Sequence, residues 1–300
     1  MITRRHTLTG AAAFALSACA PAAPSAPPWT APDSVKQQLD GIETRVGGRL
    51  GLSALDSGTG RRIDRRAHEP FAMCSTFKWL LAAAVLKSAQ YGGLRLSDRV
   101  HYTRADLLEY APVTTAHVGE GAMSIEDLCA AAVEQSDNTA ANLLLPRVNG
   151  PGGLTNFIRA SGDAYTRLDR HEPELNENAP GDPRDTTTTD DMLGSMQRIL
   201  NGDVLRAALR EKLIGWMVVS ETGKARLRGG MPAAWRVGDK TGTGGRGSVN
   251  DVAIAFPPPA NGRPRAPILI ACYMSETTAS VTNCNAAQAE IGHLIAETFA

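Results

Sequence analysis

Apolar and polar positions divide the chain into strand patterns near its two ends and helix patterns between them. Residues 34–46 carry apolar side chains at helical spacing, and Asp33 or Ser34 is expected to cap that helix. Residues 280–299 show a second helical pattern, which closes the chain. Alternating or continuous apolar runs predict strands over residues 49–55, from 61 onward, and over 236–241, 251–256 and 268–274.

The middle of the chain is helical in pattern. Residues 76–89 are apolar almost all round, which indicates a buried helix, because such a helix has no polar face to turn toward water. Further helical patterns follow between Ser124 and Leu213. A polar, proline-rich stretch from Arg167 to Asp185 interrupts them and predicts a loop.

These patterns predict an α/β fold, in which an antiparallel sheet is built from both chain ends, is flanked by helices, and receives an inserted all-helical domain. The α/β domain would comprise residues 33–70 and 219–300, and the helical domain would comprise residues 71–218 with the loop 167–185. A cleft is expected between the two parts, where binding sites tend to lie.

The composition limits which molecules the protein is expected to bind. Of the 300 residues, 43% are hydrophobic and 21% are charged, which is typical of a globular protein. The 31 basic and 31 acidic side chains balance, and no basic stripe stands out, so we expect no nucleic-acid partner. The six histidines show no metal-ligand spacing, so we expect no metal and no cofactor. We expect the protein to be a monomer.

Residues 1–19 have the features of an export signal. Arg4 and Arg5 precede a short apolar stretch, residues 10–16, which is too short to span a bilayer. The arginine pair resembles a twin-arginine (Tat) signal, which would mean export of the folded protein, and general secretion (Sec) stays open as the alternative.

Cys19 ends this segment in a way that resembles a lipobox, in which the cysteine becomes lipidated. Simple cleavage after Ala18-Cys19-Ala20 is the alternative. Residues 20–32 are rich in proline and alanine and predict an extended tether. We therefore expect a periplasmic protein whose only contact with the membrane is a lipid anchor on Cys19.

Ser75 and Lys78 lie three residues apart at the start of the predicted buried helix, so they share a helix face. A serine hydroxyl is a weak nucleophile until a neighbouring base takes its proton, and burial favours the neutral, basic form of a lysine. Lys78 stands in an otherwise apolar helix, where an unpaired charge is costly. A capping serine followed by a solvated lysine is the structural alternative.

Two further short motifs follow. Ser136-Asp137-Asn138 falls between two helical patterns and by itself predicts a helix cap, since all three residue types cap well. Lys240-Thr241-Gly242 ends a predicted strand, and the glycines from 242 to 247 predict a turn after it. A phosphate-binding loop is excluded, because these glycines follow the lysine and no helix follows them.

Taken together, the motifs at Ser75, Ser136 and Lys240 resemble those of the penicillin-recognising serine enzymes. Glu172-Pro173-Glu174-Leu175-Asn176 resembles the Glu-x-x-Leu-Asn signature of class A β-lactamases, and residues 181–187 are similar to that class as well. The resemblance covers essentially the whole chain after the export signal. It implies hydrolysis of the β-lactam ring of penicillins or cephalosporins through an acyl-enzyme, and thereby antibiotic resistance.

The resemblance implies a catalytic role for five residues. Ser75 would open the lactam ring, and either Lys78 or Glu172 would take its proton. Ser136, with Lys240 nearby, would pass a proton to the leaving nitrogen. Glu172 would then activate a water molecule that hydrolyses the acyl-enzyme.

The resemblance also implies how Glu172 is supported. Asn176 would hold the hydrolytic water together with Glu172. Arg170 and Asp185 would pair across the base of the loop and hold Glu172 in place.

The substrate carries a carboxylate, for which the resemblance implies a cationic floor. Many class A members place an arginine where this chain has Val249, and Arg226 resembles the alternative arginine of other members. The backbone N–H groups of Ser75 and Thr243 would form the oxyanion hole. The other implied substrate-binding residues are Tyr110, Asn138, Asn176, Thr241, Gly242 and Thr243.

Four cysteines follow the signal, at positions 74, 129, 272 and 284. Cys74 precedes the nucleophile, as in carbapenem-hydrolysing members, but Gly244 occupies the place of its partner there. Ala82 likewise occupies the place of the usual partner of Cys129. The resemblance therefore implies two buried free thiols. Carbapenem hydrolysis and a pairing of Cys272 with Cys284 stay open.

Three other functions share part of this pattern. A transpeptidase or carboxypeptidase acting on peptidoglycan would share Ser75, Lys78, Ser136 and Lys240 but would lack the deacylating glutamate. A β-lactam sensor would stay acylated and would usually carry a membrane-spanning part. A structural lipoprotein with a decayed site would give no reason for four intact motifs. Turnover of the acyl-enzyme distinguishes a β-lactamase from all three.

Overall fold

The computed structural model describes residues 29–300, so the export signal, the lipobox at Cys19 and most of the expected tether lie outside the described residues. Residues 29–32, the end of that tether, already contact the domain. The ring centroid of Trp29 lies 6.0 Å from that of Phe299, and Ala31 packs against buried apolar residues. No helix in the described part is long and apolar enough to cross a membrane.

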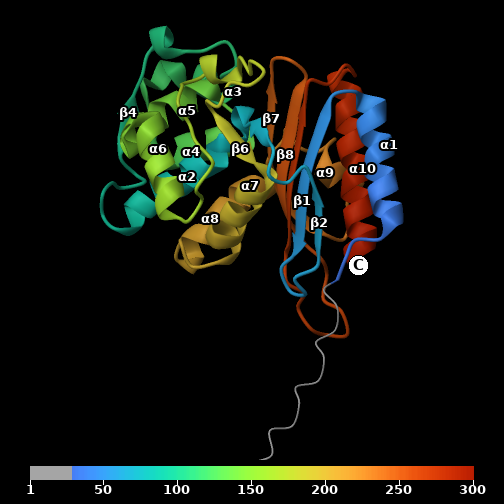
Figure 1. The fold of residues 1–300 in the computed structure, drawn as a ribbon. Coiled ribbons are helices and arrows are strands. Elements are labelled where there is room, and N and C mark those ends of the chain that lie inside the picture. Colours follow the sequence, from blue (N-terminus) through green and yellow to red (C-terminus); the bar gives the residue numbers. More distant parts are fainter. Residues whose placement is uncertain (1–28) are drawn as a thin grey trace, which may run out of the picture.

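A five-stranded antiparallel sheet forms the middle layer, and both ends of the chain contribute strands to it (Figure 1). Its strands lie in the order β2-β1-β9-β8-β7. They are β1 (Arg49–Asp56), β2 (Arg62–Arg65), β7 (Arg236–Gly244), β8 (Ser248–Phe256) and β9 (Ile268–Ser275). The sheet predicted from the sequence is therefore confirmed.

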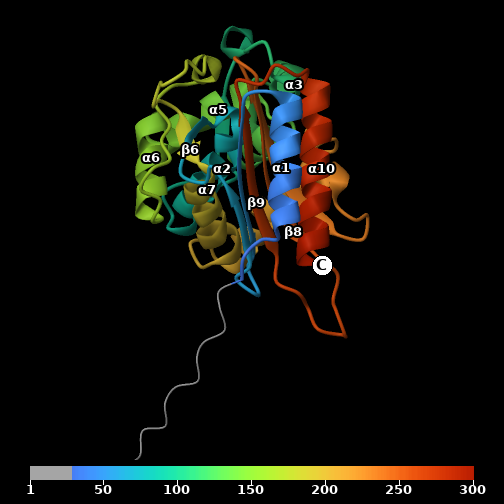
Figure 2. The ribbon, with the colours of Figure 1, turned by 45° about the vertical axis from the view of Figure 1, so that its right-hand side comes forward.

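Two long helices, α1 (Asp33–Val46) and α10 (Val281–Phe299), cover one face of the sheet, as the side view in Figure 2 shows. Ser280 caps α10 by accepting a hydrogen bond from the backbone N–H of Asn283. The cap expected for α1 is wrong, because that helix begins at Asp33 after Pro32 and has no side-chain cap. The fixed φ of proline suits a helix start, so no polar cap is needed to stop the chain there.

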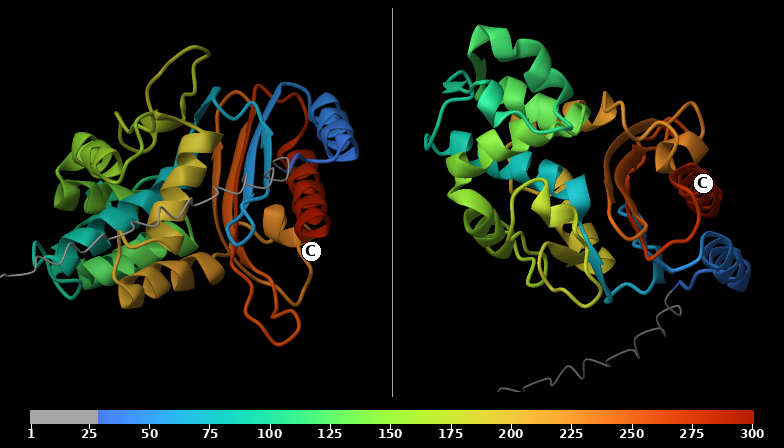
Figure 3. Two further views of the ribbon diagram at one scale, coloured as in Figure 1. Left: turned by 60° about the horizontal axis from the view of Figure 1, so that its bottom comes forward. Right: turned by 90° about the horizontal axis from the view of Figure 1, so that it is seen from above.

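The helical part lies against the other face of the sheet (Figure 3). α7 (Thr189–Met196) makes the contact with β1 and β9, while α2 (Phe77–Gln90) runs through the middle of the helical part. The surrounding helices are α3 (Pro112–His117), α4 (Ile125–Glu134), α5 (Asn138–Leu144), α6 (Gly150–Ala160), α8 (Ala207–Val218) and the short α9 (Leu227–Gly230) on the α10 side. Two small ribbons pair β3 (Pro70–Ala72) with β6 (Thr186–Thr188) and β4 (Arg99–His101) with β5 (Ala122–Ser124).

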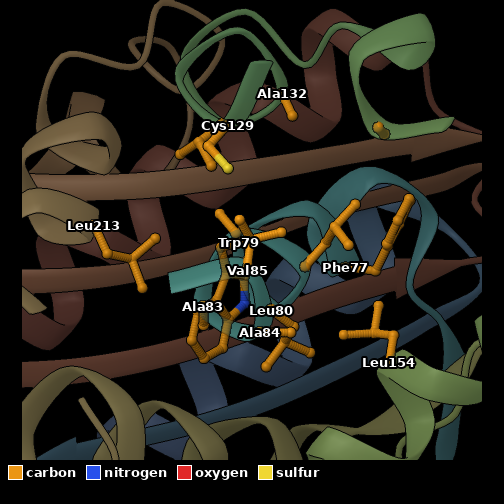
Figure 4. Packing of buried hydrophobic residues seen from close by; sticks show 14 of the residues in the cluster. Phe77, Trp79, Leu80, Ala83, Ala84, Val85, Cys129, Ala132, Leu154 and Leu213 are labelled. Carbon is orange, nitrogen blue, oxygen red and sulfur yellow. The ribbon is translucent and has the colours of Figure 1, made fainter. Parts of the chain in front are cut away.

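α2 is buried on all sides, as its sequence predicts. Every residue from Phe77 to Leu86 is buried, and Trp79 packs among side chains from neighbouring helices that include Cys129 and Leu213 (Figure 4). Burial of each large apolar side chain contributes about 1.5–3 kcal/mol. α2 is therefore a rigid platform for the residues at its N-terminal end, which include Ser75 and Lys78.

β7 runs three residues further than predicted, through Gly244, and β8 begins three residues earlier than predicted, at Ser248. The glycines from 242 to 247 predict a turn, but Gly242 lies within the strand. A β-carbon on Gly242 would lie 2.7 Å from the backbone oxygen of Met73. Glycine serves there for close packing of the strand against the turn before Ser75, and the actual turn lies at residues 245–247.

Candidate active site

Ser75 lies on a 3₁₀ turn, Cys74–Thr76, that leads directly into α2. Lys78 in the first turn of α2 is fully buried, and its Nζ donates to Ser75 Oγ at 2.9 Å. The same ammonium donates to the backbone oxygen of Ser136 at 2.8 Å and to Asn138 Oδ1 at 2.5 Å. Burial lowers the pKa of Lys78, although the neighbouring Glu172 opposes this shift.

Glu172 completes the group around the hydroxyl. Its Oε1 lies 3.2 Å from Ser75 Oγ and 2.9 Å from Lys78 Nζ, and its side chain is buried. Asn176 donates from Nδ2 to Glu172 Oε2 at 2.5 Å. Asn142, which no motif predicted, accepts from the Glu172 backbone N–H at 3.1 Å and donates to the Glu172 backbone oxygen at 2.8 Å. An asparagine within a helix gave no sequence signal for this role.

The loop that carries Glu172 is tied at its base. Arg170 Nε donates to Asp185 Oδ2 at 2.6 Å, which confirms the predicted pair. The other oxygen of the buried Asp185 accepts the backbone N–H groups of Asp169 at 2.7 Å and of Arg170 at 3.0 Å. Charge-assisted bonds of this kind are about twice as strong as neutral ones. The two ends of the loop are therefore fixed to each other.

Ser136 lies two residues before α5 and contacts Lys78, which also contacts Ser75. Asp137 caps that helix by accepting the backbone N–H of Ala140 at 2.8 Å, as predicted for this motif. Lys240 of β7 is fully buried and donates from Nζ to Ser136 Oγ at 2.9 Å. Burial holds the pKa of Lys240 well below its ordinary value, and the positive charge of Lys78 lowers it further.

Arg226 lies beneath the edge of β7. Its guanidinium donates to the backbone oxygens of Gly242 at 3.0 Å and Asn250 at 2.6 Å, and to Thr243 Oγ1 at 2.6 Å. A guanidinium stays charged even when burial lowers its pKa, as it does here. The structure thus holds a fixed cation directly behind Thr243.

A cavity of about 450 Å³ joins these groups. One lining residue, Thr222, was not predicted as a site residue; it accepts a hydrogen bond from Thr241 Oγ1 at 2.7 Å. The only hint of it was its place in the segment that carries Arg226. The lining residues are Ser75, Tyr110, Ser136, Asn138, Asn176, Thr222, Arg226, Thr241 and Thr243. The side chains of Lys78, Glu172 and Lys240 lie behind this lining, within hydrogen-bond distance of it.

All four cysteines between residues 29 and 300 are buried free thiols. Burial raises the pKa of Cys74 to about 12, so its thiol stays neutral. A β-carbon on Gly244 would lie 2.7 Å from Cys74 Sγ, which places the two residues side by side as expected. In the described part of the chain, no group of three or more His, Cys, Asp or Glu side chains is placed to hold a metal ion.

The arrangement is suited to acyl transfer. A hydroxyl, a buried carboxylate and two buried ammonium groups meet at one cavity, and a fixed guanidinium lies at its edge. Such a set can deprotonate an oxygen nucleophile, stabilise developing negative charge and bind an anionic substrate.

Comparisons with known proteins point to one family. Residues 34–299 match the model of the beta-lactamase enzyme family. The chain is 46% identical to Beta-lactamase L2 of Stenotrophomonas maltophilia over 84% of this chain and 82% of that protein. It is 42% identical to Beta-lactamase CTX-M-8 of Citrobacter amalonaticus over 84% of each.

Solved structures agree with this similarity. The class A β-lactamase of the last common ancestor of Gram-negative bacteria is 51% identical, with a TM-score of 0.85 over 89% of this chain and 100% of that one. A β-lactamase from Xanthomonas campestris pv. campestris is 44% identical, with a TM-score of 0.85 over 88% of this chain and 97% of that one.

Proposed function

Since the chain belongs to the class A β-lactamases of the beta-lactamase enzyme family, we propose a role for each residue of its site in the reaction of that class. The protein is a serine hydrolase that opens the β-lactam ring of penicillins and cephalosporins and so confers antibiotic resistance. One observation carries the assignment: Ser75 Oγ lies within hydrogen-bond distance of both a buried lysine and a buried glutamate.

Ser75 is the nucleophile. Its oxygen attacks the lactam carbonyl, an ester forms, and the ring C–N bond breaks. Glu172 accepts the hydroxyl proton at 3.2 Å, because Lys78 already donates to the same oxygen and is ion-paired with Glu172. The ammonium of Lys78 stabilises the negative charge that develops on the serine oxygen.

Ser136 delivers the proton that the leaving nitrogen needs. Its hydroxyl lies 2.9 Å from Lys240 Nζ, and the lowered pKa of Lys240 favours release of a proton toward Ser136. The backbone N–H groups of Ser75 and Thr243 form the oxyanion hole, in which each donor is worth about 3–4 kcal/mol in well-studied enzymes.

The substrate carboxylate binds at the edge of β7. Thr243 Oγ1 and Thr241 present hydroxyl groups to the cavity, and Arg226 adds positive charge from behind. Asn138 holds the amide side chain of the substrate, and Tyr110, which is half exposed, forms a wall of the cavity. The strand backbone at Gly242 completes this floor.

Lys78 contacts both Glu172 and Ser136, so it passes the proton taken from Ser75 on to Ser136, which has given its own proton to the nitrogen. Glu172 is then a carboxylate again and drives the second half of the reaction. With Asn176 hydrogen-bonded to its Oε2, the carboxylate orients a water molecule and takes its proton as that water attacks the ester. Hydrolysis regenerates the Ser75 hydroxyl and releases the ring-opened acid.

We propose that the protein works in the periplasm, held to the membrane by a lipid on Cys19 after Tat export. The basic residues Arg4 and Arg5, the short apolar stretch and the lipobox-like segment support this location. The domain acts as a monomer in this proposal, since one chain supplies every residue that lines the cavity.

Hydrolysis of a chromogenic cephalosporin by the domain 29–300 tests these roles, with wild type beside Glu172→Gln and with intact mass measured after mixing. We expect steady turnover by wild type. In the variant, Lys78 is left to take the Ser75 proton, so the ester forms slowly and is then trapped, because the amide cannot take a proton from water. An acyl adduct that persists in wild type contradicts the proposal and indicates a peptidoglycan enzyme or a sensor. Equal turnover by both proteins removes Glu172 from the mechanism.

A further inference from the structure

Three segments of the site meet at a junction formed by Cys74, Asn178, Gly244 and Gly245. Asn178 lies in the active-site loop and donates from Nδ2 to the backbone oxygen of Gly245 at 3.3 Å. The same Nδ2 lies 3.2 Å from Cys74 Sγ, in the turn that carries the nucleophile. The backbone N–H of Gly245 donates to the backbone oxygen of Asn176, in the same loop, at 3.0 Å. One side chain therefore joins the loop, the turn that follows β7 and the nucleophile turn.

The junction has no spare space. A β-carbon on Gly244 would lie 2.5 Å from Asn178 Nδ2 and 2.7 Å from Cys74 Sγ, so a side chain there would displace the amide or the thiol. Cys74 is fully buried, and its thiol is neutral and able to accept a hydrogen bond. A shift of Asn178 would therefore be transmitted to its neighbours rather than absorbed by a gap.

Two residues of the junction hold a backbone conformation that side chains disfavour. Cys74 has φ of 46° and Asn178 has φ of 54°. Asparagine tolerates this left-handed region better than most residues, whereas cysteine does not share that preference. A strained residue persists when its surroundings hold it, and strain of this kind clusters at functional sites. The amide of Asn178 is one of the contacts that hold Cys74.

The junction lies close in sequence to Ser75 and to Asn176, the partner of Glu172. Cys74 immediately precedes Ser75, and Asn176, two residues before Asn178, hydrogen-bonds Glu172. We propose that Asn178 is a positioning residue, which sets the placement of Glu172 relative to Ser75 by tying the loop to the nucleophile turn and to the turn that follows β7. This inference rests on the roles proposed above for Ser75 and Glu172.

The two chemical steps depend on this placement to different degrees. In the ester-forming step, Glu172 is the one reacting group that comes from the loop, because Lys78 contacts Ser75 from α2. In the hydrolytic step, the carboxylate must orient a water molecule with Asn176, and both belong to the loop. Loss of the Asn178 contacts should therefore slow hydrolysis of the ester more than its formation, because misplacement of a reacting group by about 1 Å costs up to about 100-fold.

Asn178→Gly is the informative variant, because glycine accepts the positive φ without strain and loses only the amide. Asn149→Gly is a matched control: Asn149 also has positive φ, at 64°, and it is exposed and lies outside the junction. We expect Asn178→Gly to lower kcat by about 10- to 100-fold and to lower KM with it. Intact mass should show acyl-enzyme accumulating in steady state, while Asn149→Gly matches wild type.

A double-mutant cycle with Cys74→Ala isolates the contact with the thiol. If this contact carries the effect, the double variant loses little more activity than Asn178→Gly alone, and additive losses overturn that part of the proposal.

The proposal fails outright if Asn178→Gly and Asn149→Gly show the same kcat and the same acylated fraction. It also fails if kcat falls with no acylated enzyme. Thermal unfolding of each variant identifies a loss of activity that comes from misfolding. If Asn178→Gly is misfolded, Cys74→Ala alone must show the same accumulation of ester. Failure of the catalytic roles themselves is seen separately, in Glu172→Gln.

Discussion

Replacing Asp251 by asparagine should stabilise the protein, and the gain should grow as pH rises. Asp251 lies on β8 opposite Thr241, so it is a diagonal neighbour of Asp239 on the same face of the sheet. Both carboxylates are fully buried. Asp239 is ion-paired with Arg228 at 2.7 Å, whereas Asp251 accepts only the backbone N–H of Leu227, and its Oδ1 has no hydrogen-bond partner in the described part of the chain.

The sign of the effect follows from the direction of the pKa shift. Burial, followed by the negative charge of Asp239, raises the pKa of Asp251 well above its ordinary value, so the folded protein keeps a proton that the unfolded chain releases. Stability linked to this proton is complete below the unfolded pKa of about 3.9 and is lost as pH rises toward the folded pKa. Within that window the free energy of unfolding falls by about 1.4 kcal/mol for each pH unit, or about 2.7 kcal/mol over two units. Asparagine needs no proton, and its amide can donate to Asp239.

Urea unfolding of wild type and Asp251→Asn at pH 5, 6, 7 and 8 measures this slope. Asp33→Asn is the control, because Asp33 is exposed at the start of α1 and forms only a surface pair with Lys36. We expect the difference between Asp251→Asn and wild type to widen with pH, while the control runs parallel to wild type. A difference that stays constant from pH 5 to 8 refutes the argument, because it means that Asp251 holds no extra proton in the folded state.

Three further changes test contacts in the site and the core. Gly223→Ala would place a β-carbon 2.2 Å from the Asp239 carboxylate, so we expect a loss of about 1–3 kcal/mol in the free energy of unfolding; an unchanged Tm contradicts this. Asn142→Ala leaves the backbone N–H and oxygen of Glu172 without their partners, so kcat should fall about 10- to 100-fold with acyl-enzyme visible by intact mass, and turnover without accumulation speaks against the role. Trp79→Ala empties the centre of the helical core and should cost about 3–5 kcal/mol in urea unfolding, while the folded fraction keeps its kcat.

The sheet and the buried helix were predictable because their signals are local and periodic. The apolar repeat of α1 and the all-apolar surface of α2 each determine a buried face without reference to the rest of the chain. The end of β7 was not predictable in this way. Gly242 marks a close approach to Met73, and a glycine that serves a distant contact looks the same in sequence as one that serves a turn.

The motif residues of the site were predictable, but the residues that hold them in place were not. Asn142 supports Glu172 through two backbone hydrogen bonds, and Asn178 joins three segments through one amide. Both contacts link positions that are far apart in sequence. An asparagine at a helix or loop position is ordinary, so its function becomes visible only when the chain is folded.

Buried charge beneath the cavity links stability to substrate binding. Arg226 and Lys240 direct positive charge toward a cavity whose substrate is an anion, and burial strengthens that attraction because little water screens it. Two ionised carboxylates at Asp239 and Asp251 would oppose this positive field. A proton held on Asp251 removes one of the two negative charges, so the protonated form of Asp251 keeps the floor of the cavity attractive to the substrate. The ionised form, which appears as pH rises, weakens the fold. The neutral amide of Asp251→Asn preserves that charge balance, so the variant should gain stability while its KM stays close to that of wild type.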